Sequence, residues 1–167
     1  IDNFEEIKRK VSIIGKLIKE IKQVDDYYIP CQRDFFAQKP HPTEWLRIRT
    51  NPNKTVFEYD RSINKKVNGE QEYAEEYETE ISNTKEFEKI LEFLDFKKVI
   101  SVEKQREYWI CGNIEVALDY INGLGHFIEA EAKGDFKNTK EARSACVKFL
   151  ENLGIKDVEN TQILKGY

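Results

Sequence analysis

The chain has 167 residues, a length that suits one domain of about 100–200 residues with a core of its own. Its 27 Lys and Arg residues against 31 Asp and Glu residues leave a formal net charge of −4, which argues against a protein that binds nucleic acid through bulk positive charge. The longest apolar runs are only a few residues, so we expect no membrane span.

Three cysteines, Cys31, Cys111 and Cys146, are spread along the chain without a Cys-x-x-Cys pair. An odd number with this spacing predicts reduced structural thiols and a cytoplasmic protein. The chain contains no Met and starts at Ile1, and we therefore expect that a few residues are missing ahead of it.

The first elements follow from capping residues and hydrophobic spacing. Asn3, with Glu6 three residues on, predicts a helix start, and apolar residues at helical spacing carry this helix to about Lys22. A short extended piece is expected around 26–29, followed by a loop over 31–43.

The rest of the chain shows the same order twice: three strands with period-two alternation, then a helix. The predicted strands are 45–49, 55–61, 72–81, 98–111, 114–121 and 126–133, with a polar loop over 62–71. Asn-Thr-Lys-Glu opens both predicted helices, one after Asn83 and one from Asn138 to about Leu153. We therefore predict one α+β domain over 1–167, built from two similar halves, whose antiparallel strands close into a barrel or form two facing sheets.

Charged side chains alternate along the predicted strands, and residues two or four apart on a strand point to the same side of the sheet. The basic pairs are Arg47 with Arg49 and Lys104 with Arg106, and the acidic pairs are Glu115 with Asp119 and Glu129 with Glu131. For any single strand, a sheet with one solvated side explains such a pattern.

If the sheet closes, the same charges line an interior, where they must be paired or bound to ions because burial of a lone charge is costly. Arg and Lys suit phosphate oxygens, and carboxylates suit Mg²⁺ or Mn²⁺. The alternative to a solvated sheet face is thus a site for a metal-bound polyphosphate.

Several motifs together resemble the CYTH family, which groups class IV adenylyl cyclases with thiamine triphosphatases and related triphosphatases. The class IV cyclases are the most similar. The motifs run in order over nearly the whole chain: Asp26-Tyr27-Tyr28, Leu46-Arg47-Ile48-Arg49, Val102-Glu103-Lys104-Gln105-Arg106, Ala117-Leu118-Asp119, Gly123-Leu124-Gly125-His126-Phe127-Ile128-Glu129 and Ile163-Leu164-Lys165-Gly166-Tyr167. Each motif alone is weak, whereas the set is specific.

The resemblance implies an eight-stranded antiparallel tunnel with charged side chains inside and helices outside. The partner would be a small molecule, a nucleoside triphosphate that enters with Mg²⁺ or Mn²⁺; a homodimer is left open. The site residues carried over are phosphate-binding Arg47, Arg49, Lys104 and Arg106, catalytic Lys104, Arg106 and Asp119, and metal-holding Asp119, Glu129 and Glu131.

The chain departs from the family pattern at two places. The family's Glu-x-Glu-x-Lys strand lies ahead of the first helix, so we expect it among the missing residues before Ile1. On the strand over 55–61 the family has a phosphate-binding Lys in a Thr-Tyr-Lys context, whereas this chain has Glu58-Tyr59-Asp60 followed by Arg61. An acidic residue inside the tunnel would repel phosphate.

Three hypotheses follow for the function. In an adenylyl cyclase, the metal would activate the ribose 3′-hydroxyl and stabilise the leaving pyrophosphate. In a triphosphatase, water would replace that hydroxyl, and in a binding protein the site would hold a phosphorylated ligand without turnover. If Glu58 and Asp60 point inward with no basic replacement, both catalytic hypotheses are weakened and binding is favoured.

Overall fold

The computed structural model describes residues 1, 3–39, 42–63 and 73–158. Most of the predicted polar loop over 62–71 and the motif at 163–167 lie outside these residues.

The chain divides into two compact units, and strands β1 (Lys16–Pro30) and β5 (Phe96–Cys111) contribute to both. Of the described residues, the first unit contains 1, 3–22 and 104–158, and the second contains 23–39, 42–63 and 73–103. That residues 1–167 form a single domain stays a prediction.

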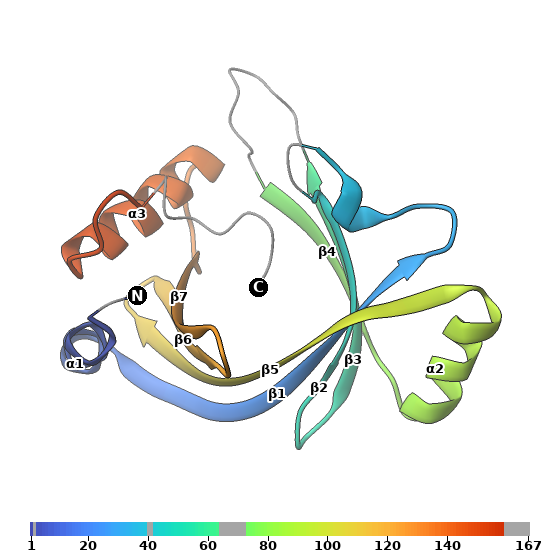
Figure 1. The fold of residues 1–167 in the computed structure, drawn as a ribbon. Helices are drawn as coiled ribbons and strands as arrows, with labels where there is room; N and C mark the ends of the chain where they lie inside the picture. Colours follow the sequence, from blue (N-terminus) through green and yellow to red (C-terminus); the bar gives the residue numbers. More distant parts are fainter. Residues whose placement is uncertain (2, 40–41, 64–72, 159–167) are drawn as a thin grey trace. The chain divides into compact units, whose positions relative to one another are not determined.

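The elements follow the predicted alternation of strands and helices (Figure 1). The helices are α1 (Phe4–Ile14), the 3-10 turn η1 (Phe35–Ala37), α2 (Thr84–Phe93) and α3 (Thr139–Asn152). The remaining strands are β2 (Glu44–Thr50), β3 (Thr55–Ile63), β4 (Tyr73–Glu80), β6 (Ile114–Ile121) and β7 (Gly125–Ala132). The predicted repeat of three strands and a helix is confirmed, as β2-β3-β4-α2 and β5-β6-β7-α3.

The strands are hydrogen-bonded in the order β4-β3-β2-β1-β5-β6-β7, and every pairing with a described register is antiparallel. The predicted α+β class with an antiparallel sheet is therefore confirmed. The predicted closed barrel of eight strands is not confirmed, because in the described part of the chain the sheet has seven strands and hydrogen bonds do not join its end strands β4 and β7. That an eighth strand completes the sheet stays a prediction.

The first helix is shorter than predicted. α1 ends at Ile14, and residues 16–22, predicted as helix, belong to strand β1. Gly15 marks the break, since a Cβ at this position would lie 2.5 Å from Cys111 Sγ on β5 and only glycine permits that approach. Pairing within the sheet then overrides the helical spacing of residues 16–22, as tertiary contacts commonly override local propensity.

In the first unit, α1 and α3 cover one face of the strands β6 and β7 and of the adjoining part of β5 (Figure 1). The inward apolar side chains come from alternate strand positions, Trp109 on β5 and Val116 and Leu118 on β6, and they meet Val11 of α1. Val11 and Val116 are fully buried. Lys104, Arg106 and Asp119 occupy alternate positions of these strands and lie on the opposite face, whereas Glu107 lies on the helix side, where it pairs with Lys8 of α1 and accepts a hydrogen bond of 3.0 Å from Trp109 Nε1.

In the second unit, α2 and η1 pack against one face of the strands β1, β2 and β3. Leu46 and Ile48 of β2 and Tyr28 of β1 lie there with Phe35 of η1 and Leu91 of α2. The arginines of β2 alternate with its apolar residues and so lie on the opposite face. In both units the main apolar core under the helices and the buried basic side chains of the strands therefore lie on opposite faces.

Within the described ranges, no helix combines the length and the apolarity that a membrane span requires. All three cysteines are free. Cys111 and Cys146 belong to the first unit's core, as predicted for structural thiols, whereas Cys31 is exposed.

Candidate functional site

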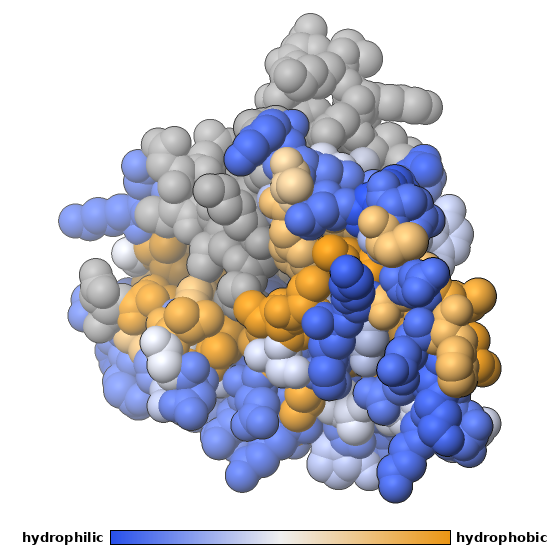
Figure 2. All heavy atoms as spheres, turned by 45° about the vertical axis from the view of Figure 1, so that its right-hand side comes forward, coloured by the Kyte–Doolittle hydropathy of each residue, from blue (hydrophilic) through white to orange (hydrophobic). Residues whose placement is uncertain are grey.

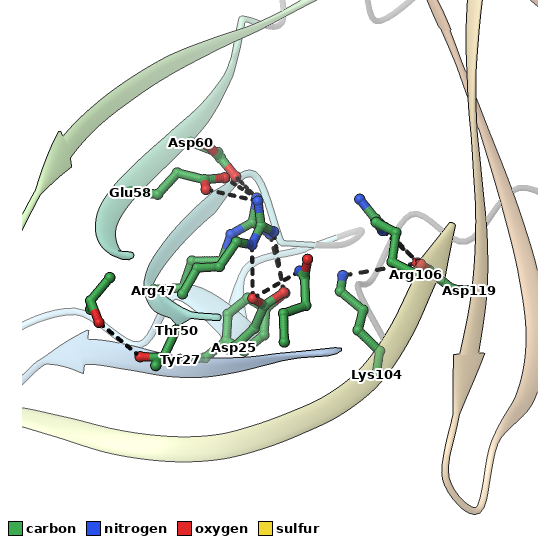
Figure 3. Close-up of polar contacts among 12 residues, drawn as sticks. Asp25, Tyr27, Arg47, Thr50, Glu58, Asp60, Lys104, Arg106 and Asp119 are labelled. Atoms are coloured by element: carbon green, nitrogen blue, oxygen red, sulfur yellow. Dashed lines mark hydrogen bonds and ion pairs between the residues drawn. The ribbon is translucent and has the colours of Figure 1, made fainter. Parts of the chain in front are cut away.

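Charged side chains gather in two clusters, one in each unit, and each cluster lies on the face of its own strands opposite the apolar core. Figure 3 shows polar contacts of these side chains. The arginine cluster of the second unit consists of Asp25, Tyr27, Arg47, Arg49, Glu58 and Asp60. The Arg106 cluster of the first unit consists of Lys104, Arg106, Asp119 and Glu129. The predicted phosphate-binding residues are therefore divided, two to each unit.

Strand register brings the arginine cluster together. Arg47 of β2 lies directly across from Tyr27 of β1 and from Glu58 of β3, and Arg49 lies across from Asp25. Residues directly opposite on an antiparallel pair have their side chains on the same face, about 5 Å apart. The pairing thus places an acidic side chain beside each arginine.

Glu58 lies between the two arginines. Its Oε1 accepts a short hydrogen bond from Arg47 Nη2, and its Oε2 accepts one of 3.1 Å from Arg49 Nη1. Glu58 is only 1% exposed, so its charge is balanced by these partners rather than by bulk water. One carboxylate thereby occupies both guanidinium groups (Figure 3).

Asp25 holds the other side of Arg49. Its Oδ1 accepts from Arg49 Nε at 2.8 Å and its Oδ2 from Nη2 at 3.2 Å, the two-point pairing that strengthens Arg–carboxylate contacts. Asp25 is fully buried, and Gln23 donates a further hydrogen bond of 3.3 Å to its Oδ1. The hydroxyl of Tyr27 accepts a hydrogen bond of 3.3 Å from Arg47 Nη1.

Asp60 completes the arginine cluster and has one unsatisfied oxygen. Its Oδ2 lies 3.2 Å from Arg47 Nη2, whereas Asp60 Oδ1 and Arg47 Nε are buried and have no hydrogen-bond partner among the described residues. Burial raises the pKa of Asp60 in spite of the nearby guanidinium groups. Burial by itself would lower the pKa of Arg47, but Tyr27 and the neighbouring carboxylates outweigh it and raise that pKa.

Arg106 is the centre of the first unit's cluster. Its Nε and Nη2 donate hydrogen bonds of 2.6 and 2.5 Å to the two oxygens of Asp119, which lies directly across on β6. The same Nη2 donates to Glu129 Oε2 at 2.7 Å. Lys104 Nζ lies 3.9 Å from Asp119 Oδ2. Lys104, Arg106 and Asp119 are all buried, and Asp119 completely so.

The two acidic residues keep Arg106 charged. Burial by itself would lower the pKa of this guanidinium, but the hydrogen bonds to Asp119 and the charges of Glu129 and Asp119 raise it far above its usual value. As far as the described residues go, the cluster contains two basic and two acidic side chains, whose formal charges balance.

The predicted metal ligands are divided between this cluster and the surface. Asp119 and Glu129 belong to the Arg106 cluster, whereas Glu131 is exposed and its Oε1 accepts a hydrogen bond of 2.6 Å from Lys133. All three carboxylates share one face of β6 and β7, and carboxylate oxygens are donors that Mg²⁺ and Mn²⁺ prefer, so the donor chemistry fits such a cation. In the part of the chain described, however, no group of three or more His, Cys, Asp or Glu side chains is arranged to hold a metal ion.

On β3, the two acidic residues that depart from the family pattern lie beside the arginines. Glu58 and Asp60 are both on the face of the arginine cluster. Arg61 lies directly across from Glu44 and so faces the other side of the sheet, where its Nη2 is 3.8 Å from Glu75 Oε2. Arg61 therefore does not replace the basic residue, which counts in favour of the binding hypothesis.

The sequence alone does not assign Asp25 and Tyr27 to the site, although both side chains accept hydrogen bonds from its arginines. The signal is the alternation of Gln23, Asp25 and Tyr27 along β1, and it becomes readable only when residues 16–30 are taken as one strand. The helical spacing of residues 16–22 conceals it.

Residues 3–167 match a family model described as the CYTH domain. The chain is 30% identical over 169 residues to a Methanocaldococcus jannaschii protein named "Putative adenylate cyclase MJ0240", and this match covers 100% of the chain and 91% of that protein. Two solved Pyrococcus horikoshii structures are also similar. PH1819 has a TM-score of 0.76 at 29% identity, with 91% of this chain and 86% of the other covered. PH1012 has a TM-score of 0.75 at 24% identity, with 93% and 87% covered.

These matches extend over the strands that carry both ionic clusters and agree with the motifs found in the sequence. The prediction of an enzyme of the adenylyl cyclase or triphosphatase kind is thereby confirmed at the level of the family. With a family model across residues 3–167 and a relative 30% identical across the whole chain, this protein belongs to the CYTH family.

Proposed function

We propose that the chain is a class IV-type adenylyl cyclase, which converts ATP to cyclic AMP and pyrophosphate with a divalent cation. The name of the M. jannaschii relative supports this choice. The observation that carries it is Arg106, a buried guanidinium held in one orientation by Asp119 and Glu129 on the ionic face. A donor fixed before the substrate arrives stabilises developing negative charge without the cost of reorganisation.

The basic residues of the clusters would bind the phosphates. Arg47, Arg49 and Arg106 have planar forked donors that match phosphate oxygens, and Lys104 adds a point charge. Placed against the β- and γ-phosphates, such groups neutralise the charge that develops on the leaving pyrophosphate. That both clusters line one closed tunnel stays a prediction.

A divalent cation, when bound, supplies Lewis-acid stabilisation of phosphoryl oxygens and lowers the pKa of an attacking hydroxyl group. Asp119, Glu129 and Glu131 would hold it, and the choice between Mg²⁺ and Mn²⁺ belongs to the proposal. The side chains of Glu129 and Glu131 are 49% and 64% exposed, so they have oxygens within reach of a hydrated cation.

Binding without turnover is the second candidate. It is favoured by Glu58 and Asp60, which lie among the arginines where the family has a basic residue. A site with these acids would hold phosphate less tightly and would stabilise less charge in a transition state.

The deciding experiment incubates full-length protein with ATP and Mg²⁺ or Mn²⁺ and separates cyclic AMP plus pyrophosphate from ADP plus phosphate. We expect cyclic AMP. ADP and phosphate would make the protein a triphosphatase, with water in place of the ribose hydroxyl. Binding of ATP with no turnover of ATP, tripolyphosphate or thiamine triphosphate would leave the second candidate.

Arg106→Ala tests the residue that carries the proposal. We expect triphosphate affinity to fall roughly 10- to 100-fold, the loss that corresponds to one or two hydrogen bonds from a charged donor. Isothermal titration calorimetry with tripolyphosphate and Mg²⁺ measures it. Arg61→Ala is the matched control, because Arg61 lies on the other face of its sheet and is exposed.

Unchanged affinity in Arg106→Ala would contradict a phosphate-binding role. Because this variant removes the partner of a fully buried carboxylate, it costs about 3–5 kcal/mol of stability. Circular dichroism therefore checks folding first, and Arg106→Lys, which keeps the charge but loses the planar fork, repeats the titration if folding fails.

A further inference from the structure

Glu58 occupies the position among the arginines that a phosphate group would take. Its two oxygens bind two different guanidinium groups, Oε1 that of Arg47 and Oε2 that of Arg49. A phosphate bridges neighbouring arginines in the same way, through separate oxygens that accept charge-assisted hydrogen bonds. An incoming phosphate and Glu58 therefore compete for the same donors.

The charges of the arginine cluster make this competition strong. Among the described residues, two arginines face three carboxylates, those of Asp25, Glu58 and Asp60, so the formal sum of these five side chains is +2 − 3 = −1. A triphosphate alone would add negative charge to this group of side chains. Affinity for a phosphate is low unless a positive charge arrives with it or a carboxylate leaves.

If a phosphate displaces Glu58 from the arginines, Glu58 needs a new partner, because an ionised carboxylate that is 1% exposed is costly without one. A neighbouring carboxylate oxygen can bind the same partner together with Glu58. Asp60 lies two residues on and on the same face, is 9% exposed, and its Oδ1 has no hydrogen-bond partner among the described residues. Two adjacent carboxylates with a spare buried oxygen suit a hard divalent cation.

We propose that Glu58 is an internal counter-anion that keeps Arg47 and Arg49 paired, and that a triphosphate binds there only with a divalent cation of its own, distinct from the one assigned to Asp119, Glu129 and Glu131, that takes over Glu58 and Asp60. The proposal rests on the proposed function in one respect, that the ligand is a triphosphate. It accounts for the lack of a ready-made metal group in the described residues, since these carboxylates are directed at guanidinium groups until the exchange.

The test is calorimetric titration of tripolyphosphate into wild-type protein and Glu58→Gln, each in EDTA and in Mg²⁺. We expect wild type to bind at least about tenfold more tightly in Mg²⁺ than in EDTA, because the cation frees the charged hydrogen-bond donors of Arg47 and Arg49 for the phosphate. In Glu58→Gln we expect affinity in EDTA to rise at least about tenfold and the Mg²⁺ dependence to shrink.

Glu78→Gln is the matched control. Glu78 lies directly across from Glu58 on β4 and is exposed, so this variant removes the same charge on the same face without freeing the arginines. An equal rise in affinity in both variants would show a general charge effect and overturn the proposal.

Equal affinities of wild type and Glu58→Gln in EDTA would overturn the role of Glu58 and leave the proposed function standing. No binding by any variant in either buffer would remove the triphosphate itself and with it the proposed function. Glu58→Gln leaves two arginines against Asp25 and Asp60, a balanced set that favours folding. Should it fail to fold, Glu58→Asp, which withdraws the carboxylate by one methylene, gives the same comparison.

Discussion

Glu44 shows how this protein keeps a buried carboxylate ionised. Arg33 donates to both of its oxygens at 3.0 and 3.1 Å, Gln38 donates at 2.8 Å, and the Tyr59 hydroxyl donates at 2.5 Å. Burial would raise the pKa of Glu44, but these hydrogen bonds and the charge of Arg33 lower it. The network also ties the segment around Gln38 to strands β2 and β3.

Glu44→Gln should therefore destabilise the protein at neutral pH. A carboxyl with a lowered folded-state pKa contributes stability that is present above its unfolded pKa, about 4.3, and is lost as pH falls through the folded value. We expect the free energy of unfolding to drop by about 1–3 kcal/mol at pH 7 and the difference from wild type to narrow below about pH 4.

Urea unfolding of both proteins at pH 7 and pH 3 measures this difference. Glu80→Gln is the control, because Glu80 is exposed and its ion pair with Lys54, 3.3 Å long, should contribute only about 0–1 kcal/mol. If the difference in unfolding free energy between wild type and Glu44→Gln stayed constant with pH, a lowered pKa of Glu44 would be contradicted.

Among the site residues, the sequence places each predicted charge on the correct face of its strand. Arg47 and Arg49 share one face, and Arg106, Asp119 and Glu129 share another, because period-two alternation is a local property of strands. The partners of these charges are decided by register between strands, which local alternation does not contain. Thus the sequence indicates which charged side chains share a face but not that Glu58 already pairs with Arg47 and Arg49.

At the scale of elements, helix starts are well predicted because capping is local. Asn83 and Asn138 accept hydrogen bonds from the backbone N–H groups of Glu86 and Glu141 at 3.2 and 2.9 Å, as the repeated Asn-Thr-Lys-Glu motif predicts. Asn3 is also at an N-cap, but its side chain makes no capping hydrogen bond.

Alanine substitutions should show how much each of the three N-cap residues contributes to stability. Asn83→Ala and Asn138→Ala each remove a capping bond and should cost about 1 kcal/mol, whereas Asn3→Ala should cost clearly less. Thermal unfolding followed by circular dichroism at 222 nm compares them. A cost for Asn3→Ala as large as for the other two would show that Asn3 caps α1 in solution.

The end of α1 and the start of β1 could not be predicted in this way. Apolar residues continue at helical spacing beyond Gly15, so the local pattern favours helix as far as Lys22. The close approach of Gly15 to Cys111, almost a hundred residues away in sequence, ends the helix instead.

At the scale of the whole molecule, the surface agrees with a chain of which 35% of the residues are charged. Figure 2 shows hydrophilic side chains over much of the visible face, with apolar ones between them. Ile90, Phe93 and Leu94 near the end of α2 are among the exposed apolar residues. Apolar atoms contribute more than half of the accessible surface of a typical folded protein, so exposed apolar residues are expected.

Ligand binding should stabilise the whole protein. A ligand that binds only the folded form at 100 times its Kd adds about 2.7 kcal/mol, which raises Tm by about 5–10 °C for a chain of this size. We expect this rise with tripolyphosphate and Mg²⁺, and only a small one with tripolyphosphate in EDTA. Differential scanning fluorimetry measures both, with sulfate at equal ionic strength as the control.

An equal rise in Tm with sulfate would indicate general stabilisation by anions instead of a specific site. If tripolyphosphate in EDTA raised Tm as much as tripolyphosphate with Mg²⁺, the need for a divalent cation would be contradicted.

The sequence by itself determined the α+β class, the repeat of three strands and a helix, the family, and the faces on which Arg47, Arg49, Lys104 and Arg106 lie. These follow from periodicity, capping and motif order, all of which are local. Only the tertiary structure decided that α1 ends at Ile14, just before Gly15, that Arg61 faces away from the arginine cluster, and that Glu58 joins two arginines. Each of these depends on which residues far apart in the chain come into contact, and contact at long range is set by packing and strand register rather than by neighbours in sequence.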